Sequence, residues 1–281
     1  MATHIYQIFY NEATEKQLDR GFIGLENRDN PRPDWREYWT IRQFFHDNTL
    51  NENDLYGFFS PNFHGKTRLE SSQVHQFIAA NPGADVYHFS PFFQDSACYL
   101  NMFEQGNRYH PGMVELVGSF LDSIDLKVDL TRLAMDFRST IYCNFMVAKP
   151  VFWEKWFAIN ERLFEDVEHG TGEFAKRMNA LTTYHKMPLD MKVFIMERMA
   201  SLILALDHSL TVAHYDIGQM PWSDMLYYPC RDDMFTLNAL KLAYLSTGQN
   251  RYLELFYPLR NQVLKRCDRL YGDENRLTFF Q

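Results

Sequence analysis

Short apolar runs alternate with amphipathic stretches along most of the chain. Such runs are typical of buried strands, and apolar residues spaced three and four apart are typical of helices. The runs predict strands at 4–10, 55–60, 84–90, 140–148 and 211–215. The amphipathic stretches predict helices at 34–46, 71–80, 111–124, 150–168 and 191–207. Strands that alternate with helices indicate an α/β fold in which helices flank a sheet.

The C-terminal part of the chain has a different pattern. From Asp232 onward the sequence is helical in character, and Gly248 separates two periodic stretches at the place where a helix commonly ends. We therefore predict a C-terminal helical hairpin. The predicted domains are a sheet domain at 1–220 and a helical extension at 221–281.

Charge and composition narrow the class of protein. The 281 residues carry 28 Lys and Arg against 36 Asp and Glu, a net charge of −8, and contain no basic tract. Binding a nucleic-acid backbone needs clustered basic residues, so we expect no nucleic-acid partner. No apolar stretch is long enough for a transmembrane segment, and the N-terminus shows no signal-peptide pattern. We expect a cytoplasmic protein and leave attachment to the inner face of the membrane open.

Several familiar chemical motifs are absent. The four cysteines form no Cys-x-x-Cys pair, which indicates reduced thiols, and the sequence has no phosphate-binding glycine loop, serine nucleophile elbow or His-Glu-x-x-His helix. Ligands of α/β sheets bind at the carboxyl ends of strands. The segments that follow the predicted strands are therefore the places to look: 11–12, 60–66, 90–94 and Lys149.

The polar loop after the second predicted strand has the composition of a binding site. Ser60, Asn62, His64 and Lys66 offer hydroxyl, amide, imidazole and ammonium groups around a glycine. Such groups can hold a diphosphate, with Lys66 as the cation, and an ordinary polar turn is the alternative. Glu197 lies in an apolar helix, where a carboxylate must be paired, exposed on one face or functional.

Aromatic residues make up 16% of the chain. Those at 35–39 lie beside charged residues, an arrangement that suits stacking on a base or a sugar ring. The alternative is that Trp35 and Tyr38 pack into the core while the charged side chains stay in water.

Several segments, in this order, resemble GT-A-type bacterial glycosyltransferases of capsular-polysaccharide and O-antigen biosynthesis. The resemblance runs over roughly residues 5–206. The similar segments are Asn30-Pro31, 37–39, 55–63, 85–91, 144–149 with 152–156, and 196–199 with Ser201 and Leu204. The resemblance implies a GT-A-like, Rossmann-like mixed sheet. It also implies transfer of a sugar from a nucleotide-sugar donor, with a UDP-sugar as first choice, to a polysaccharide or lipid-linked glycan acceptor.

On this hypothesis the donor nucleotide lies over the end of the first strand and its diphosphate over the end of the second. The expected donor-binding residues are Tyr10, Asn11, Glu12, Asn30, Arg32, Ser60, Asn62, His64, Lys66 and Asn144. An inverting enzyme needs a carboxylate that takes the proton of the acceptor hydroxyl. We expect Glu197 in this role, with Asp136 and Glu37 as the other candidates.

The chain departs from the resembled family at the metal site. GT-A enzymes usually hold Mn²⁺ or Mg²⁺ between an Asp-x-Asp motif and the donor diphosphate, because hard cations prefer oxygen ligands. This chain has Ser60-Pro61-Asn62 at the corresponding strand end. We therefore assign no metal ligand and leave Mn²⁺ or Mg²⁺ open as a cofactor. Lys66 and helix N-termini are the other sources of positive charge.

Two other classes of protein stay open at this point. The missing Asp-x-Asp favours a non-catalytic binding or scaffold subunit of a polysaccharide assembly complex, with the C-terminal hairpin as its docking surface. A glycan hydrolase that uses two carboxylates is the third possibility, because a sequence does not give the distance between two carboxyl groups.

Overall fold

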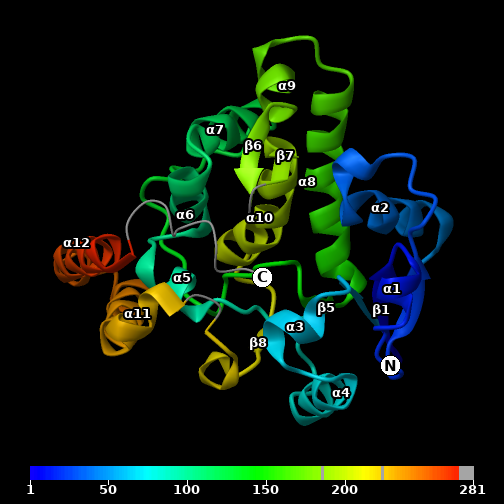
Figure 1. Cartoon of the computed structure of the whole chain (residues 1–281), viewed down its shortest axis with the longest axis horizontal. Coiled ribbons are helices and arrows are strands. Elements are labelled where there is room, and N and C mark those ends of the chain that lie inside the picture. Colours follow the sequence, from blue (N-terminus) through cyan, green and yellow to red (C-terminus); the bar gives the residue numbers. More distant parts are fainter. Residues whose placement is uncertain (185–186, 223–224, 272–281) are drawn as a thin grey trace. The chain divides into compact units, whose positions relative to one another are not determined.

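The computed structural model describes residues 1–184, 187–222 and 225–271, and the fold is α/β (Figure 1). A six-stranded mixed sheet has the strand order β2-β1-β3-β5-β4-β8. These strands are β1 (Thr3–Phe9), β2 (Ile23–Glu26), β3 (Leu55–Phe59), β4 (Val86–His88), β5 (Met146–Ala148) and β8 (Val212–His214). The predicted class, a mixed sheet flanked by helices with a paired C-terminal helical segment, is confirmed.

Strand direction determines which loops share an edge of this sheet. β1 runs parallel to β2 and β3, and β4 runs parallel to β8. β5 is antiparallel to both of its neighbours, β3 and β4. The carboxyl ends of β1, β3 and β4 therefore lie at the same edge of the sheet as the amino end of β5.

Helices account for most of the remaining described residues. The longer ones are α2 (Glu37–Asp47), α4 (Ser71–Ala80), α6 (Met102–Tyr109), α7 (Met113–Ser123), α8 (Pro150–Glu168), α10 (Met191–Leu206), α11 (Arg231–Thr247) and α12 (Arg251–Tyr271). The shorter ones are α1 (Glu12–Glu15), α3 (Phe63–Thr67), α5 (Phe93–Cys98) and α9 (Glu173–Met178), with 3-10 turns η1 (Pro33–Trp35), η2 (Ile217–Gln219) and η3 (Met225–Cys230). Gly248 ends α11 with φ +68°, as its place between the two periodic stretches predicts.

The chain divides into two compact units that interleave along the sequence. The first comprises Met1–Pro91, Ile141–Gly170 and Met196–Pro221, and the second comprises Phe92–Thr140, Thr171–Ile195 and Trp222–Gln281. The predicted domains, 1–220 and 221–281, are consecutive along the sequence instead. Their division into a catalytic domain and an extension stays a prediction. The six-stranded sheet belongs to the first unit.

Aromatic side chains fill the core of the first unit. Phe59 stacks on Phe63 with ring centroids 4.2 Å apart, and Phe145 meets Phe63 edge to face at 5.0 Å. Gly57 allows β3 and β5 to approach closely, because a Cβ there would lie 2.8 Å from the Val147 side chain. The aromatic packing therefore anchors the start of α3 and the residues before β5 to the sheet.

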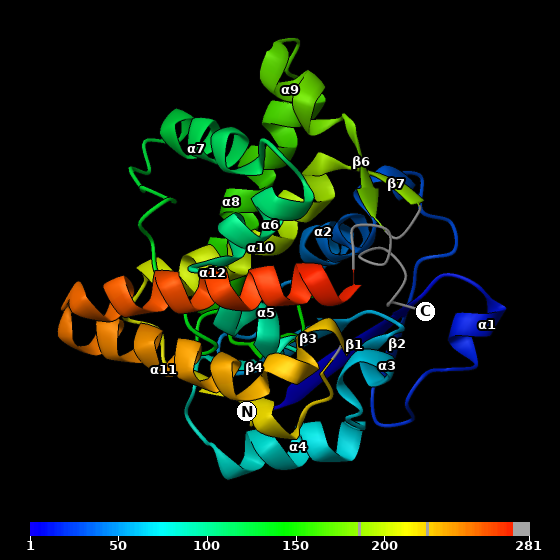
Figure 2. The same ribbon diagram turned by 60° about the vertical axis from the view of Figure 1, so that its left-hand side comes forward.

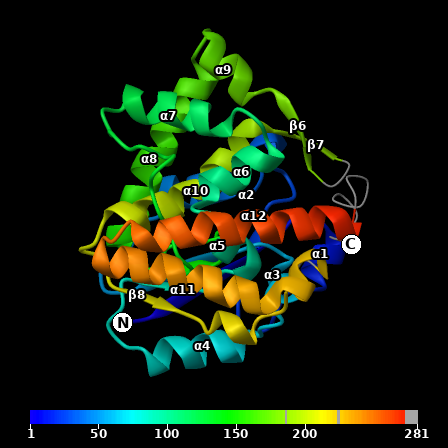
Figure 3. The same cartoon turned by 90° about the vertical axis from the view of Figure 1, so that its left-hand side faces the viewer.

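In the second unit, α11 and α12 form the predicted antiparallel pair and lie side by side (Figure 2). The same unit contains a small antiparallel hairpin of β6 (Leu181–Tyr184) and β7 (Met187–Asp190), visible in Figure 3. The sequence analysis does not predict this hairpin. Among the described helices, none combines the length and the apolar character needed to cross a membrane.

Several predicted boundaries are wrong for identifiable reasons. The predicted strand at 140–148 is reduced to β5, because Cys143 and Asn144 adopt left-handed backbone conformations. The helix predicted from Asp34 begins at Glu37, because Arg36 has φ +51° and separates η1 from α2. Between the predicted strand at 4–10 and the predicted helix at 34–46, where no element is predicted, the chain forms the edge strand β2.

Candidate functional site

The candidate site lies at the sheet edge where β1, β3 and β4 end and β5 begins. Three of the four predicted segments, 11–12, 60–66 and 90–94, follow β1, β3 and β4. The prediction for Lys149 is wrong, because β5 is antiparallel and its carboxyl end lies at the opposite edge. There Lys149 pairs with Asp85, with Nζ 2.9 Å from Oδ1. The residues before β5 replace it at the candidate site.

A strained turn precedes β5. Cys143 and Asn144 have φ values of +63° and +52°, a conformation that is costly for two consecutive non-glycine residues. Side-chain oxygens accept hydrogen bonds from three successive backbone N–H groups of this turn. Ser201 Oγ accepts from Ile141 N at 2.7 Å, Ser90 Oγ from Tyr142 N at 2.8 Å, and Glu197 Oε1 from Cys143 N at 2.5 Å.

Glu197 and Ser201 are four residues apart on α10, and this spacing puts both side chains on one face of the helix. That face holds the turn at 141–143 against the end of β4, where Ser90 lies. A strained backbone conformation of this kind persists only where many surrounding contacts hold it in place. Such conformations are common at ligand-binding sites.

Lys66 and Glu197 both contact Cys143. Lys66 Nζ lies 3.1 Å from Cys143 Sγ and 6.0 Å from the centre of the Phe145 ring. Burial raises the pKa of the Cys143 thiol to about 11; Lys66 opposes this shift, while Glu197 and Glu37 add to it. Two predicted residues, one from α3 and one from α10, therefore contact the same turn.

Asn144 adds an unsatisfied polar group to this cluster. Its Oδ1 is buried, and no hydrogen-bond partner for it exists among the described residues. Buried polar atoms in native structures are nearly always hydrogen-bonded, so each exception requires an explanation. Extending the registers of β3 and β4 along β5 brings Ser60 and Ser90 level with Asn144.

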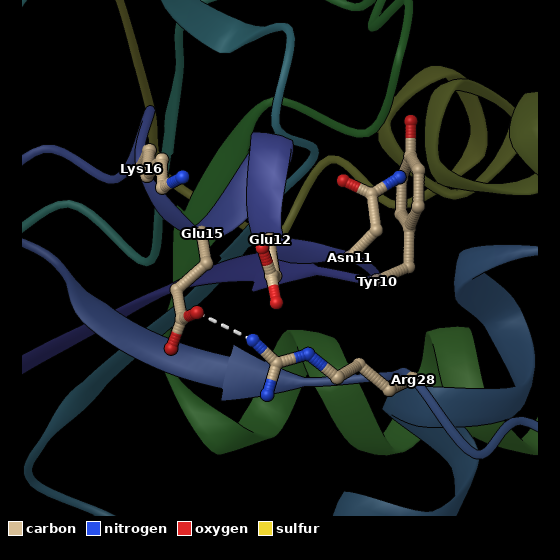
Figure 4. Close-up of a pocket in the computed structure, with 6 residues that line it drawn as sticks. All are labelled: Tyr10, Asn11, Glu12, Glu15, Lys16 and Arg28. Carbon is tan, nitrogen blue, oxygen red and sulfur yellow. Dashed lines mark hydrogen bonds and ion pairs between the residues drawn. The ribbon is translucent and has the colours of Figure 1, made fainter.

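A second part of the site is an open pocket at the end of β1 (Figure 4). Its volume is about 690 Å³, and its lining residues are Tyr10, Asn11, Glu12, Glu15, Lys16 and Arg28. Arg28 pairs with Glu15 across the pocket and lies over the Phe9 ring. Tyr10 is 49% exposed, so its ring is accessible for stacking. The pocket therefore combines an exposed ring with both signs of charge.

Asn11 has a structural task as well. Its side chain caps α1 by accepting from Thr14 N at 2.9 Å, and the Thr14 hydroxyl accepts in return from Asn11 N at 3.1 Å. This capping box fixes the chain direction immediately after β1. Glu12, the next residue, is thereby held at the pocket.

Asn30 and Arg32 form hydrogen bonds and ion pairs with other residues of the first unit. Asn30 Oδ1 accepts from Arg32 N at 2.7 Å, and the Arg32 guanidinium contacts Asp34 at 2.9 Å and Glu168 at 2.5 Å. Hydrogen bonds to Glu168 and Asp34 raise the pKa of Arg32. Asp34 and Glu168 therefore already neutralise Arg32, the cation that the sequence analysis places near the donor nucleotide.

The aromatic residues Trp35 and Tyr38 pack into the core, which is the second of the two alternatives that the sequence offers for them. Trp35 and Tyr38 are buried against α8, and the Tyr38 hydroxyl donates to Glu161 at 2.5 Å. Arg42 also donates to Glu161, and these contacts hold α2 alongside α8, as Figure 1 shows.

The segment after β3 is a short helix rather than the predicted loop. Ser60 O accepts from Phe63 N at 3.1 Å, and Asn62 is the residue before α3. His64 contacts the Leu69 carbonyl through Nδ1 at 3.2 Å. Asn62 and His64 are exposed, whereas Lys66 is partly buried against the turn before β5.

Asp136 belongs to the second unit. Its carboxylate is buried, accepts from Arg138 N at 2.8 Å, and forms an ion pair with the Arg138 guanidinium at 2.6 Å. Asp136 O also accepts from the Thr140 hydroxyl. These contacts give Asp136 a structural role in the second unit.

Sequence reasoning missed the residues that organise the site. Cys143 lies at its centre, and only its left-handed backbone distinguishes it, a feature no local pattern predicts for cysteine. Ser90 lies in the predicted segment 90–94 and Ser201 in one of the segments that carry the resemblance, but neither was predicted to hold this turn. Among the described residues, no group of three or more His, Cys, Asp or Glu side chains could hold a metal ion.

Comparisons with models of known families, with curated proteins and with solved structures found no match for this chain. The fold and the site define this chain as an α/β protein. It has a mixed six-stranded sheet and a polar site at the edge where most strands end.

Proposed function

We propose that this protein is a GT-A-like glycosyltransferase, moving a sugar from a nucleotide-sugar donor to a glycan acceptor in cell-surface polysaccharide biosynthesis. The observation that carries the proposal is the meeting of Lys66 and Glu197 at Cys143, next to the buried side chain of Asn144, at the edge of the sheet. Glu197 and Asn144 belong to segments that resemble capsular and O-antigen glycosyltransferases, whereas Lys66 lies close to the strand end at which this chain departs from that family.

The donor binds along the shared edge of the sheet. The nucleoside occupies the pocket at the end of β1, where the exposed Tyr10 ring stacks on the base. The diphosphate extends toward the end of β3, the neighbouring parallel strand, where Lys66 supplies a positive charge. A UDP-sugar is the expected donor, and a polysaccharide or lipid-linked glycan at the inner face of the membrane is the expected acceptor.

Glu197 acts as the general base. Its Oε1 is fixed by the N–H of Cys143, and Oε2 forms no hydrogen bond or ion pair in the described part of the chain. Oε2 takes the proton of the acceptor hydroxyl, while the oxygen of this hydroxyl forms a bond to the anomeric carbon of the donor sugar. The bond from this carbon to the diphosphate breaks, and the released UDP carries the electron pair. Lys66 stabilises the charge that develops on the leaving phosphate.

The residues present do not fit the metal site of the resembled family. Ser60-Pro61-Asn62 replaces Asp-x-Asp, and Ser60 and Asn62 offer neutral oxygens where the resembled family binds its divalent cation through carboxylates. No step of the mechanism is therefore derived through a metal ion.

A panel of UDP-sugars tests the proposal. We expect the purified protein to release UDP from at least one of them, faster when oligosaccharides or lipid-linked glycans are added, and the assay is run with Mn²⁺, with Mg²⁺ and with EDTA. Calorimetric titration accompanies it. If no nucleotide sugar binds under any of these conditions, the enzyme proposal is wrong and a scaffold subunit of a polysaccharide assembly complex takes its place.

Replacing Lys66 with methionine is expected to weaken UDP binding about 30-fold, because a charge-assisted hydrogen bond to phosphate contributes about 2 kcal/mol. Binding of UMP, which lacks the second phosphate, should change less. Calorimetric titration measures both dissociation constants. Lys149→Met is the matched control, because Lys149 lies at the opposite edge of the same sheet. Equal losses in the two variants would contradict a role for Lys66 at the diphosphate.

A further inference from the structure

Two buried cysteines of the second unit lie side by side. Cys230 is the last residue of η3, and Cys267 lies near the end of α12, which packs against η3. Their sulfur atoms are 4.0 Å apart, and each side chain is 1% exposed. The sulfurs of a disulfide are about 2 Å apart, so the two sulfur atoms must approach each other by about 2 Å to bond.

The other two cysteines have different surroundings. Cys98 is buried in the second unit, where desolvation raises the pKa of its thiol. Cys143 belongs to the first unit and contacts Lys66. Among the described residues, the only two cysteine sulfurs within 4 Å of each other are those of Cys230 and Cys267.

A guanidinium group lies beside this pair. Arg266 Nη1 is 3.6 Å from Cys230 Sγ and 2.8 Å from Asp233 Oδ2. The proximity of Cys230 and Asp233 raises the pKa of Arg266, which keeps the side chain positively charged. Arg266 therefore places a positive charge beside one of the two thiols.

We propose that Cys230 and Cys267 are an oxidation site, at which a peroxide converts the two thiols into a disulfide. The sulfur of Cys230 attacks one peroxide oxygen, the O–O bond breaks, and sulfenic acid and water form when the peroxide is H₂O₂. The sulfur of Cys267 then attacks the sulfenic sulfur, and a second water leaves as the disulfide forms. Each peroxide is reduced by two electrons, and the thiol pair is oxidised by two.

The disulfide would tie the start of α11 to α12. It closes a loop between positions 37 residues apart, and such a crosslink restricts the unfolded chain. We expect the thermal midpoint of the protein to rise by about 5 °C on oxidation and to return on reduction with dithiothreitol. This site is independent of the glycosyl-transfer site proposed above.

Peptide mapping after treatment with H₂O₂ tests the proposal. The full-length protein is treated, alkylated after unfolding and digested under non-reducing conditions. We expect a crosslinked peptide pair containing Cys230 and Cys267, together with the loss of two hydrogen atoms from the intact mass. Non-reducing electrophoresis should show a monomer, because the bond lies within one chain.

Two variants separate this pair from the other thiols. Cys267→Ser should abolish the crosslink and leave Cys230 as a sulfenic or sulfinic acid, whereas Cys98→Ser should form the crosslink as the unmodified chain does. Should Cys267→Ser fail to fold, the peptide map of the unmodified chain still decides. A Cys98–Cys267 crosslink, or full alkylation of all four thiols after peroxide, would overturn the proposal.

Discussion

Replacing Glu197 with glutamine is expected to slow sugar transfer about 10³-fold while UDP binding stays within twofold of the unmodified protein. The amide oxygen of glutamine can still accept the N–H of Cys143, so the strained turn before β5 keeps its anchor. The amide cannot take a proton from the acceptor hydroxyl. Turnover with acceptor and calorimetric UDP titration measure the two effects separately.

The neighbouring anchor provides the control. Ser201→Ala removes the acceptor of the Ile141 N–H from the same face of α10 without touching a carboxylate. We expect it to lower stability and weaken donor binding, with a smaller loss of turnover at saturating donor. If Glu197→Gln keeps normal turnover, Glu197 is a positioning residue for the turn and the base must be sought elsewhere, with Glu37 as the next candidate.

Replacing Lys241 with methionine is expected to lower the free energy of unfolding at pH 7 by about 3 kcal/mol. Lys241 is fully buried in α11 and donates to the carbonyl oxygens of Ser96, of Tyr99 at 2.7 Å and of Met135 at 2.6 Å. Methionine fills a similar volume but leaves these three acceptors without a donor. Urea unfolding measures the difference between the two proteins.

The loss in free energy of unfolding caused by Lys241→Met should grow with pH. Burial lowers the pKa of Lys241 to about 7, from an ordinary value of 10.5. Between these values the unfolded chain binds a proton that the folded chain releases, so this group makes unfolding costlier as pH rises. Methionine lacks that contribution, and the gap between the two proteins should widen from pH 7 toward pH 10.

Lys127→Met is the control for both measurements, because Lys127 is an exposed residue of the same unit. An exposed ion pair contributes little, so its loss should change stability by less than about 1 kcal/mol at any pH. A Lys241→Met variant as stable as this control would show that the three carbonyl oxygens find other partners.

Periodicity predicted those parts of the fold that local sequence determines. The apolar runs at 4–10 and 55–60 form β1 and β3, and the stretch after Pro150 forms α8. Gly248 predicted the end of α11 because its backbone conformation favours glycine. Strand direction is not local: nothing in residues 146–148 shows that β5 runs against its neighbours, and the prediction for Lys149 failed for this reason.

The site was predictable in its members but not in its geometry. Lys66 and Glu197 were conspicuous as a cation in a polar loop and a carboxylate in an apolar helix. Their meeting at Cys143 depends on tertiary contacts from Ser90 and Ser201, which force a strand-like sequence into a strained turn. Conversely, Arg32 was conspicuous as a loop cation, but the distant Glu168 pairs with it.

A crystal structure of the protein with UDP tests the central claim most directly. Glycosyl transfer at this edge predicts the uracil in the pocket beside Tyr10 and the diphosphate within hydrogen-bonding distance of Lys66 Nζ. The Asn144 side chain should then face the bound ligand. UDP bound at another edge of the sheet, or no UDP bound at saturating concentration, would contradict the assignment of this site.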